Sequence, residues 1–235
     1  MSLPSEPSVL PPVTSIADAI ARMEQISAAL PPDDGLACFN RMYLQVTEEV
    51  GQQVTAGFFA DPAFTSALDV TFANLYLDAA DNVDSPGSVP LAWRPLTQAR
   101  ADKGIEPIQF ALAGMNAHIN HDLPIAVVQT CQELGTTPTS DAHLSDYQKI
   151  DRLLDAIEQS VRQSFENAAE RAVDRHIQAV CNLIACWSIT SARDVAWANC
   201  LLLWQVRNDP VAYQLVCDSL AAGANLASHL LLVAV

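Results

Sequence analysis

Apolar side chains recur at intervals of three and four residues along most of the chain, and prolines, aspartates and glycines interrupt the pattern. This spacing places apolar residues on one face of an α-helix, whereas a half-buried strand would show strict alternation. No convincing run of strand-like alternation occurs. The pattern therefore predicts an all-α, bundle-like protein with about eight helical stretches.

Capping residues and helix breakers set the expected boundaries. Caps are expected at Thr14 or Ser15, at Asp33 or Asp34, and at Asp61, and Pro62 suits a first helical turn. Pro124 should kink or divide a long helix, because proline lacks the amide donor. The expected helices are residues 15–30, 34–50, 62–81, a short helix through 93–94, 107–134, 145–172, 177–187, 191–205 and 210–235.

The last three stretches carry the most apolar side chains, so we expect them to be the central helices of the fold. Residues 1–14 are proline-rich and lack the features of a secretory signal, so they are interpreted as an N-terminal arm. Residues 15–235 can form one domain with a substantial core. The apolar runs 201–206 and 230–235 are far shorter than the about 20 residues that cross a bilayer.

The net charge is -15, from 27 acidic and 12 basic residues, and no basic run occurs. Nucleic acids and anionic membrane surfaces bind clustered lysine and arginine, so neither is an expected partner. The six cysteines form no C-x-x-C pair and lie mostly among apolar helical neighbours. They are interpreted as reduced core thiols of a cytoplasmic protein.

Three polar, reactive side chains lie close together on the apolar helix of residues 107–134. On an ideal helix His118, His121 and Asp122 share an arc about 100° wide, beside the small residues Ala111 and Gly114. Imidazole and carboxylate groups are costly to bury, so their presence there predicts a site with room for a ligand.

His118 and Asp122 are four residues apart, so the carboxylate can orient the imidazole. A histidine starts with a pKa close to neutral pH, which suits a general acid or base. The first hypothesis is therefore proton-transfer catalysis. The alternative is a buried histidine that a neighbouring carboxylate satisfies for structural reasons only.

A metal-dependent hydrolase is a second hypothesis, with a divalent metal on His118 and Asp122. His121 and the distant His176, beside Asp174, could be accessory groups, and Asp69, Asp78 and Asp81 are further oxygen donors. No second H-x-x-H or E-x-x-H motif follows, and H-x-x-H-D lacks the glutamate of the zinc-protease pattern. No metal or other cofactor is therefore the first expectation.

Arg193 and Trp197 are the leading candidates for substrate binding, because a charged side chain begins an apolar helix there. A buried Arg193 could hold a substrate carboxylate or fix His118 and Asp122, whereas the simpler alternative is an ion pair with Asp194. The weaker candidates for binding substrate are Arg41, Tyr43 and Trp93.

Several enzyme classes lack their sequence signatures. There is no serine nucleophile elbow, phosphate-binding glycine loop, dinucleotide fingerprint or catalytic cysteine pattern in the chain. A serine hydrolase, nucleotide-dependent kinase or nicotinamide dehydrogenase is therefore not expected.

The segment Ala113-Gly-Met-Asn-Ala-His-Ile-Asn-His-Asp-Leu-Pro124 resembles an uncharacterised, mainly bacterial family catalogued as domain of unknown function 5995. Supporting segments are Phe39-Asn-Arg-Met-Tyr43, Phe72-Ala-Asn-Leu-Tyr76, Ala92-Trp93 and Arg193-Asp-Val-Ala-Trp197. The resemblance extends from about Asp18 to the C-terminus. It implies a helical fold and no established reaction, and its core positions match Asn116, His118, Asn120 and Asp122, whereas the position of His121 varies.

The leading function hypothesis is an enzyme that acts on a small, partly apolar metabolite by cyclisation, isomerisation or elimination, as in specialised metabolism. His118 would be the acid or base, and Asp122 would orient it. Asn116 and Asn120 lie on the opposite side of an ideal helix, so we expect them to bond neighbouring helices. A noncatalytic ligand carrier or scaffold is the third hypothesis, and homo-oligomerisation remains open.

Overall fold

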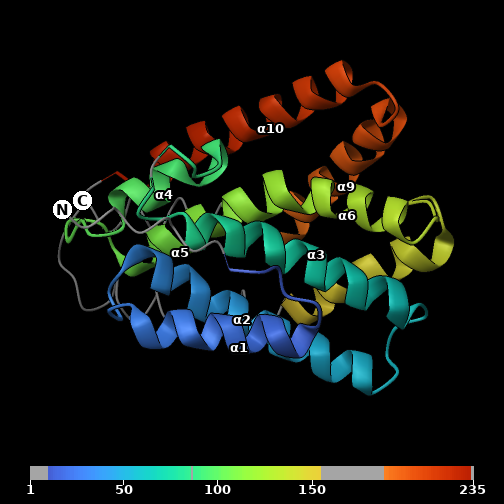
Figure 1. The fold of residues 1–235 in the computed structure, drawn as a ribbon, viewed down its shortest axis with the longest axis horizontal. Helices are drawn as coiled ribbons and strands as arrows, with labels where there is room; N and C mark the ends of the chain where they lie inside the picture. The colour runs from blue at the N-terminus through green and yellow to red at the C-terminus, as the bar shows by residue number, and fades with distance from the viewer. Residues whose placement is uncertain (1–9, 86, 155–187, 234–235) are drawn as a thin grey trace, which may run out of the picture.

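A computed structural model describes residues 10–85, 87–154 and 188–233. These residues form a single all-α domain without a strand, as the apolar spacing predicts (Figure 1). The helices are α1 (Ile16–Ala29), α2 (Gly35–Thr55), α3 (Pro62–Asp81), η1 (Leu91–Trp93), α4 (Arg94–Ala99), α5 (Pro107–Ala117), η2 (His118–Asp122), α6 (Leu123–Glu133), α9 (Ile189–Val206) and α10 (Pro210–Leu231). Residues 141–154 are also helical, and the helix expected over 177–187 lies outside the described residues.

The predicted caps are confirmed. Ser15 accepts a hydrogen bond from the amide of Asp18, Asp34 from Leu36, and Asp61 from Phe64. α2 continues past the expected end near Val50 to Thr55, and Gly57, with a positive φ of 73°, follows its end. The helix expected to begin at Ser145 begins at residue 141, so part of the predicted polar connection is helical.

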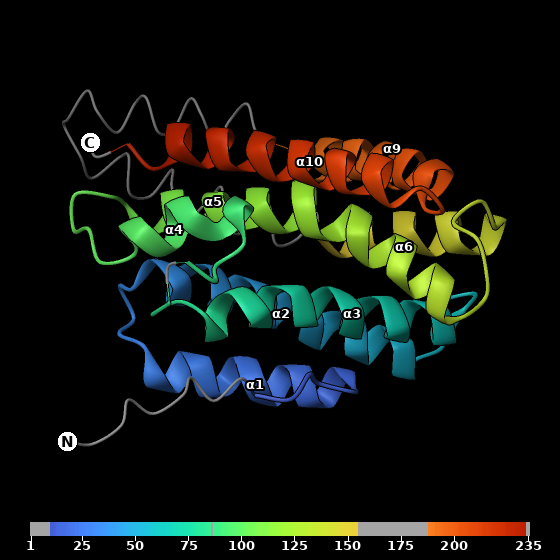
Figure 2. The ribbon, with the colours of Figure 1, turned by 45° about the horizontal axis from the view of Figure 1, so that its top comes forward.

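The helices are stacked in tiers (Figure 2). α1 is the lowest tier in this view, α2 and α3 form the next, and α5 and α6 lie above them with α9 and α10 on top. α5 packs against α2 and α10, and α6 packs against α3 and α9. The rod formed by α5, η2 and α6 is therefore at the centre, with nearly every side chain of α5 buried.

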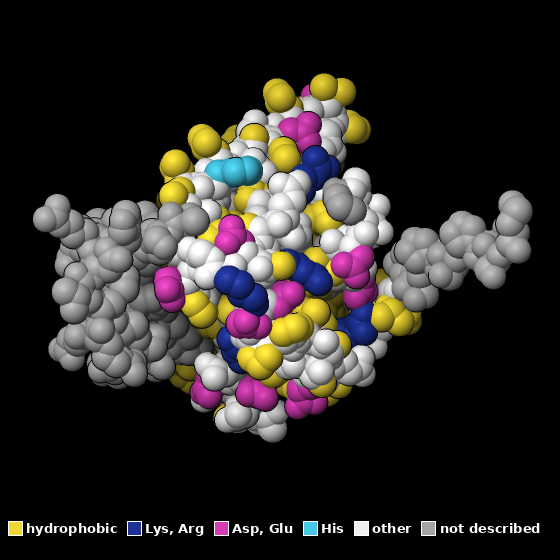
Figure 3. All heavy atoms as spheres, turned by 90° about the vertical axis from the view of Figure 1, so that its left-hand side faces the viewer, with side chains coloured by type: hydrophobic (Ala, Val, Ile, Leu, Met, Phe, Trp, Pro, Cys, Tyr) yellow, Lys and Arg dark blue, Asp and Glu magenta, His cyan; other side chains and the backbone are white. Residues whose placement is uncertain are grey.

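The expectation that the C-terminal helices are central is wrong for α10. Its outward side chains Val211, Leu215, Leu226 and Leu230 are exposed, and hydrophobic side chains are visible along this edge of the molecule (Figure 3). Apolar content alone does not show how much of a helix is buried. One face of α10 is buried, through its alanines, Ser228 and Leu231, whereas the other face is exposed to solvent. None of the helices in the described ranges is both long and apolar enough to span a bilayer.

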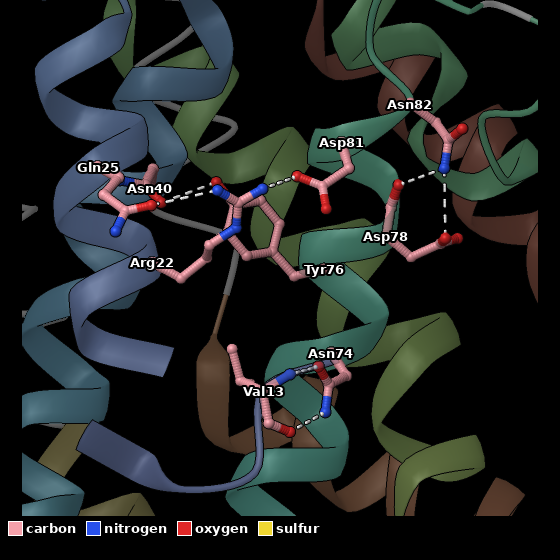
Figure 4. Close-up of polar contacts among 9 residues, drawn as sticks. All are labelled: Val13, Arg22, Gln25, Asn40, Asn74, Tyr76, Asp78, Asp81 and Asn82. Atoms are coloured by element: carbon pink, nitrogen blue, oxygen red, sulfur yellow. Dashed lines mark hydrogen bonds and ion pairs between the residues drawn. The ribbon is translucent and has the colours of Figure 1, made fainter. Parts of the chain in front are cut away.

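The segment before α1 is attached to α3. Val13 exchanges two hydrogen bonds with the side chain of Asn74, and Arg22 of α1 pairs with Asp81 near the end of α3 (Figure 4). The predicted arm of residues 1–14 thus ends against the domain, and residues 1–9 lie outside the described part of the chain. The free thiols of Cys131 and Cys200 are buried, as expected for core cysteines.

Candidate active site

The central rod changes its helical geometry at the histidine motif. η2 is a π-helical turn, in which the amide of Leu123 donates to the carbonyl of His118, five residues earlier. Pro124 follows in the first turn of α6 and has no amide to offer the carbonyl of Asn120. The interruption predicted at Pro124 is therefore a wide turn that carries the site, and such turns are frequent at functional sites.

Asp122 is the centre of a buried hydrogen-bond cluster. Its Oδ2 lies 2.9 Å from Nδ1 of His118 and 3.0 Å from Nε1 of Trp93, and its Oδ1 lies 2.6 Å from Nδ1 of His121. An ionised carboxylate only accepts hydrogen bonds, so each of the three nitrogens is the donor. His118 consequently carries its proton on Nδ1, and Nε2 has a free lone pair when the ring is neutral.

The environment favours an ionised Asp122 beside a neutral His118. Burial would raise the pKa of Asp122, but hydrogen bonds from His118 and His121 outweigh it, and the pKa lies below its ordinary value. For His118, burial lowers the pKa, and the opposing effect of Asp122 is smaller. A neutral imidazole whose second nitrogen bonds a carboxylate is the form that accepts a proton as a general base.

Aromatic rings fix the plane of His118. Its ring is stacked on Phe72, with centroids 3.4 Å apart and planes 5° from parallel. Tyr43 meets the same ring edge to face at 4.5 Å. Asp122 and these rings together hold the imidazole in one orientation, so the direction of Nε2 is set before any ligand binds.

His118 is part of the wall of a mostly apolar cavity between α2, α3, η2, α9 and the helix of residues 141–154. The space open to the centre of a water molecule is about 70 Å³. One water needs about 10–15 Å³ of such space, so the cavity has room for a small molecule. The apolar part of its wall includes Phe39, Met42, Val46, Leu68, Phe72, Ile119, Leu123 and Ile150.

Four cavity-lining residues carry a buried polar atom with no hydrogen-bond partner among the described residues. These atoms are Nε2 of His118, the hydroxyl oxygens of Tyr43 and Thr65, and Oδ2 of Asp69. Only two other such atoms occur in the described ranges. Buried polar groups are nearly always paired in native proteins, so this concentration points to a ligand or water that binds there.

Sequence reasoning missed most of this polar set. Tyr43 was expected only as a weaker substrate contact and Asp69 only as a possible metal donor, while Thr65 was not expected at all. A signal existed, because Thr65, Asp69 and Phe72 follow one another at i, i+4 and i+7 on a face with Leu68. Burial raises the pKa of Asp69 to about 7.

Arg193 is buried at the cavity wall and binds the helix of residues 141–154. It ion-pairs with Asp151, donates to the carbonyl of Tyr147 and lies over the Tyr147 ring. The sequence suggested Asp194 as the ion-pair partner of Arg193, whereas in the structure the partner is Asp151. The side chain of Arg193 bonds Asp151 and Tyr147 and, among the described residues, not Asp122, so its position does not support a role in fixing His118.

Three of the predicted substrate contacts, Trp197, Arg41 and Trp93, do not line the cavity. Trp197 packs on Tyr147 behind the wall, and Arg41 bonds the carbonyl of Pro32 at the surface. Trp93 acts through its bond to Asp122. Asn116 donates to α10 at Ala224 and Ser228, as the helical wheel predicts for a scaffold residue, and Asn120 bonds Asn116.

The described residues do not provide a set of ligands for the hypothetical metal ion. Among them no group of three or more histidine, cysteine, aspartate or glutamate side chains is arranged to hold a metal ion. His121 is already bonded to Asp122, and Asp81 is paired with Arg22. His176 and Asp174 lie outside the described residues, so their part in such a site stays a prediction.

A family model matches nearly the whole chain. The chain matches a family of unknown function, DUF5995, over residues 16–234. No curated protein and no solved structure gives a significant match. Because the match covers nearly the whole chain and includes the His118 to Asp122 turn, the protein belongs to the DUF5995 family.

Proposed function

We propose that the protein is an enzyme that moves a proton on a small, mostly apolar metabolite, in an isomerisation, cyclisation or elimination. The observation that carries the proposal is the state of His118. Its Nδ1 is fixed by Asp122, while Nε2 is buried at the wall of an apolar cavity and has no hydrogen-bond partner among the described residues. A base placed in this way acts on a bound molecule and not on bulk solvent.

The arrangement supplies the parts that proton transfer needs. Asp122 holds the reactive tautomer and stabilises the imidazolium that forms when Nε2 accepts a proton. Trp93 and His121 keep Asp122 ionised and oriented. The apolar wall excludes water from the reacting atoms, which strengthens each electrostatic interaction inside.

The substrate and setting follow from the same features. A small, uncharged molecule fits a mainly apolar cavity, because burying a net charge there would be costly. No cofactor is needed for proton transfer by a histidine. The acidic chain and its buried free thiols fit a cytoplasmic protein without a nucleic-acid or membrane partner.

The proposal can be tested without knowing the substrate. The protein is incubated in D₂O with a small-molecule extract of the producing cells, and mass spectrometry identifies compounds that gain deuterium at carbon. Wild type should label one compound or a small set. His118→Gln should reduce the labelling rate about 100-fold or more, because the proton acceptor is lost.

His229→Gln is the matched control, because His229 is exposed on α10 and bonds only the carbonyl of Asn225. This variant should label the same compounds at the wild-type rate. Equal labelling by folded His118→Gln and wild type would refute the proposal. Lost catalysis with unchanged thermal stability would speak against a purely structural role for the pair.

A further inference from the structure

Asp69 and Tyr43 share the cavity with His118 but have no part in the cluster around Asp122. Asp69 comes from α3 and Tyr43 from α2, and both side chains are buried. Oδ2 of Asp69 and the hydroxyl oxygen of Tyr43 have no partner in the described part of the chain. Thr47, one turn after Tyr43, uses its hydroxyl proton on the Tyr43 carbonyl.

The protonation states of these groups are set by their surroundings. The titratable groups that line the cavity with Asp69 are Tyr43 from α2, His118 from η2, Tyr147 from the 141–154 helix and Arg193 from α9. Arg193 is paired with Asp151. Burial raises the pKa of Asp69 to about 7 and, with Asp69 nearby, raises the pKa of Tyr43. Both groups therefore offer a proton while His118 offers a lone pair.

We propose that Asp69 and Tyr43 bind the oxygen atom of a neutral carbonyl substrate, and that His118 removes the proton from its α-carbon. This inference rests on the proposed function and names its substrate class. An apolar site in which a tyrosine and a protonated carboxylic acid donate to one oxygen is a known solution for stabilising an enolate. Such a site also needs one separate base, and Nε2 of His118 is available.

The reaction balances without a further reagent. Nε2 of His118 takes the α-proton, the carbon–hydrogen electron pair becomes the new carbon–carbon double bond, and the carbonyl π electrons move to oxygen. That oxygen takes or shares the proton of Asp69, with Tyr43 as second donor. When the imidazolium exchanges its proton with D₂O, return of a deuteron to the same carbon gives hydrogen exchange, whereas proton return to another carbon gives an isomer. In both cases the oxygen gives its proton back to Asp69 as the carbonyl re-forms.

The remainder of the wall restricts the substrate to a compact, uncharged carbonyl compound. Phe39, Leu68 and Phe72 leave apolar surface for its hydrocarbon part. Thr65, one turn before Asp69, adds one more unpartnered hydroxyl for a second polar group. A carboxylate substrate is disfavoured because Arg193 is already paired and Asp69 would repel it when ionised.

The test uses cyclohexanone as the probe. Loss of its α-hydrogens to D₂O is followed by proton NMR with wild type, Asp69→Asn, Tyr43→Phe and His118→Gln. Wild type should catalyse exchange, and each variant should fall about 100-fold or more. Asp81→Asn is the matched control, because Asp81 lies on the same helix but pairs with Arg22 outside the cavity. It should match wild type.

The pH profile separates a catalytic acid from a structural one. The wild-type rate should rise as His118 loses its proton and fall above about pH 7 as Asp69 ionises. Asp69→Asn should lack the fall at high pH. Its folding is checked by thermal unfolding at pH 8, where the loss of a buried carboxylate should make it at least as stable as wild type.

Two outcomes would overturn this inference and leave the proposed function standing. The first is full exchange by Asp69→Asn and Tyr43→Phe while His118→Gln is inactive. The second is no exchange of cyclohexanone by wild type although the same protein labels compounds of the cell extract. Exchange that persists in His118→Gln would instead refute the proposed function itself.

Discussion

At the scale of single residues, Asp122 depends on several hydrogen-bond donors to remain charged inside the fold. It is buried, and its two oxygens accept from two histidines and one tryptophan. A buried carboxylate keeps its charge only while donors replace the water it has lost. The orientation of His118 therefore depends on Trp93, although the hydrogen bond of Trp93 goes to Asp122 and not to the imidazole.

Trp93→Phe should show this dependence. The variant keeps an aromatic ring but loses the donor to Asp122, so the free energy of unfolding should fall by about 1.5–3 kcal/mol more than packing loss alone. Urea unfolding at pH 7 measures it. Trp197→Phe is the control, because that ring packs on Tyr147 and has no hydrogen bond within the described part of the chain. Equal losses in both variants would show that the hydrogen bond to Asp122 adds nothing.

Asp69 makes a separate residue-scale prediction about pH. Its pKa is raised by burial from 3.8 to about 7, so the folded state holds a proton that the unfolded chain has released. Below pH 4 this bound proton contributes about 4 kcal/mol to the free energy of unfolding. That contribution is lost as pH rises towards 7. Relative to wild type, Asp69→Asn should therefore gain stability as pH rises over this range. Parallel pH curves for the two proteins would contradict the raised pKa.

The limits of sequence reasoning are clearest among these residues. The His118 and Asp122 pairing follows from a spacing of four, and the caps at Ser15, Asp34 and Asp61 follow from their local chemistry. Which polar atoms lack a partner depends on how distant helices meet. The sequence therefore places Thr65 and Asp69 on one helical face, but their lack of a partner beside His118 follows only from the packing of α3 against η2.

At the scale of elements, α2 and α5 cross so closely that a glycine is required. A Cβ on Gly114 would lie 2.4 Å from Cγ of Phe39, whose ring also lines the cavity. Gly114→Ala should therefore destabilise the protein by about 1–3 kcal/mol through overpacking. It should also displace Phe39 and slow the proposed reaction.

Gly223→Ala is the natural comparison for this variant. Gly223 lies within α10, and a Cβ there would meet no atom within 4 Å. The substitution should stabilise the protein by up to about 1 kcal/mol, because alanine favours the helix over glycine. Thermal unfolding of both variants measures the difference. If both substitutions raised the stability, or both lowered it, the close approach of α2 and α5 would not explain the effect of Gly114→Ala.

Element order and helix ends were predictable because they depend on neighbours in the chain. The π turn at His118 was not, since an ideal helical wheel assumes one residue spacing throughout. The exposed face of α10 was also unpredictable, because apolar content alone does not say which side meets another helix.

At the scale of the whole molecule, the net charge of -15 acts against compaction. Raising the ionic strength from about 0.01 M to about 0.1 M shortens the Debye length from about 30 Å to about 10 Å. Sodium chloride should therefore raise the melting temperature over this range. The buried pair of Arg193 and Asp151 is screened less than exposed charges. A melting temperature that falls with salt would show that attractive ion pairs dominate.

The π turn also constrains how the chain can change in length. α5 presents its sides to α2 and α10, whereas α6 beyond the turn presents its sides to α3 and α9. Removing one residue between His118 and Asp122 would restore uniform α winding and leave the faces of α6 nearly in place, but it would change the spacing of this pair from four residues to three. This stretch should tolerate conservative replacement far better than any gain or loss of a residue, although it lies in the middle of a helix.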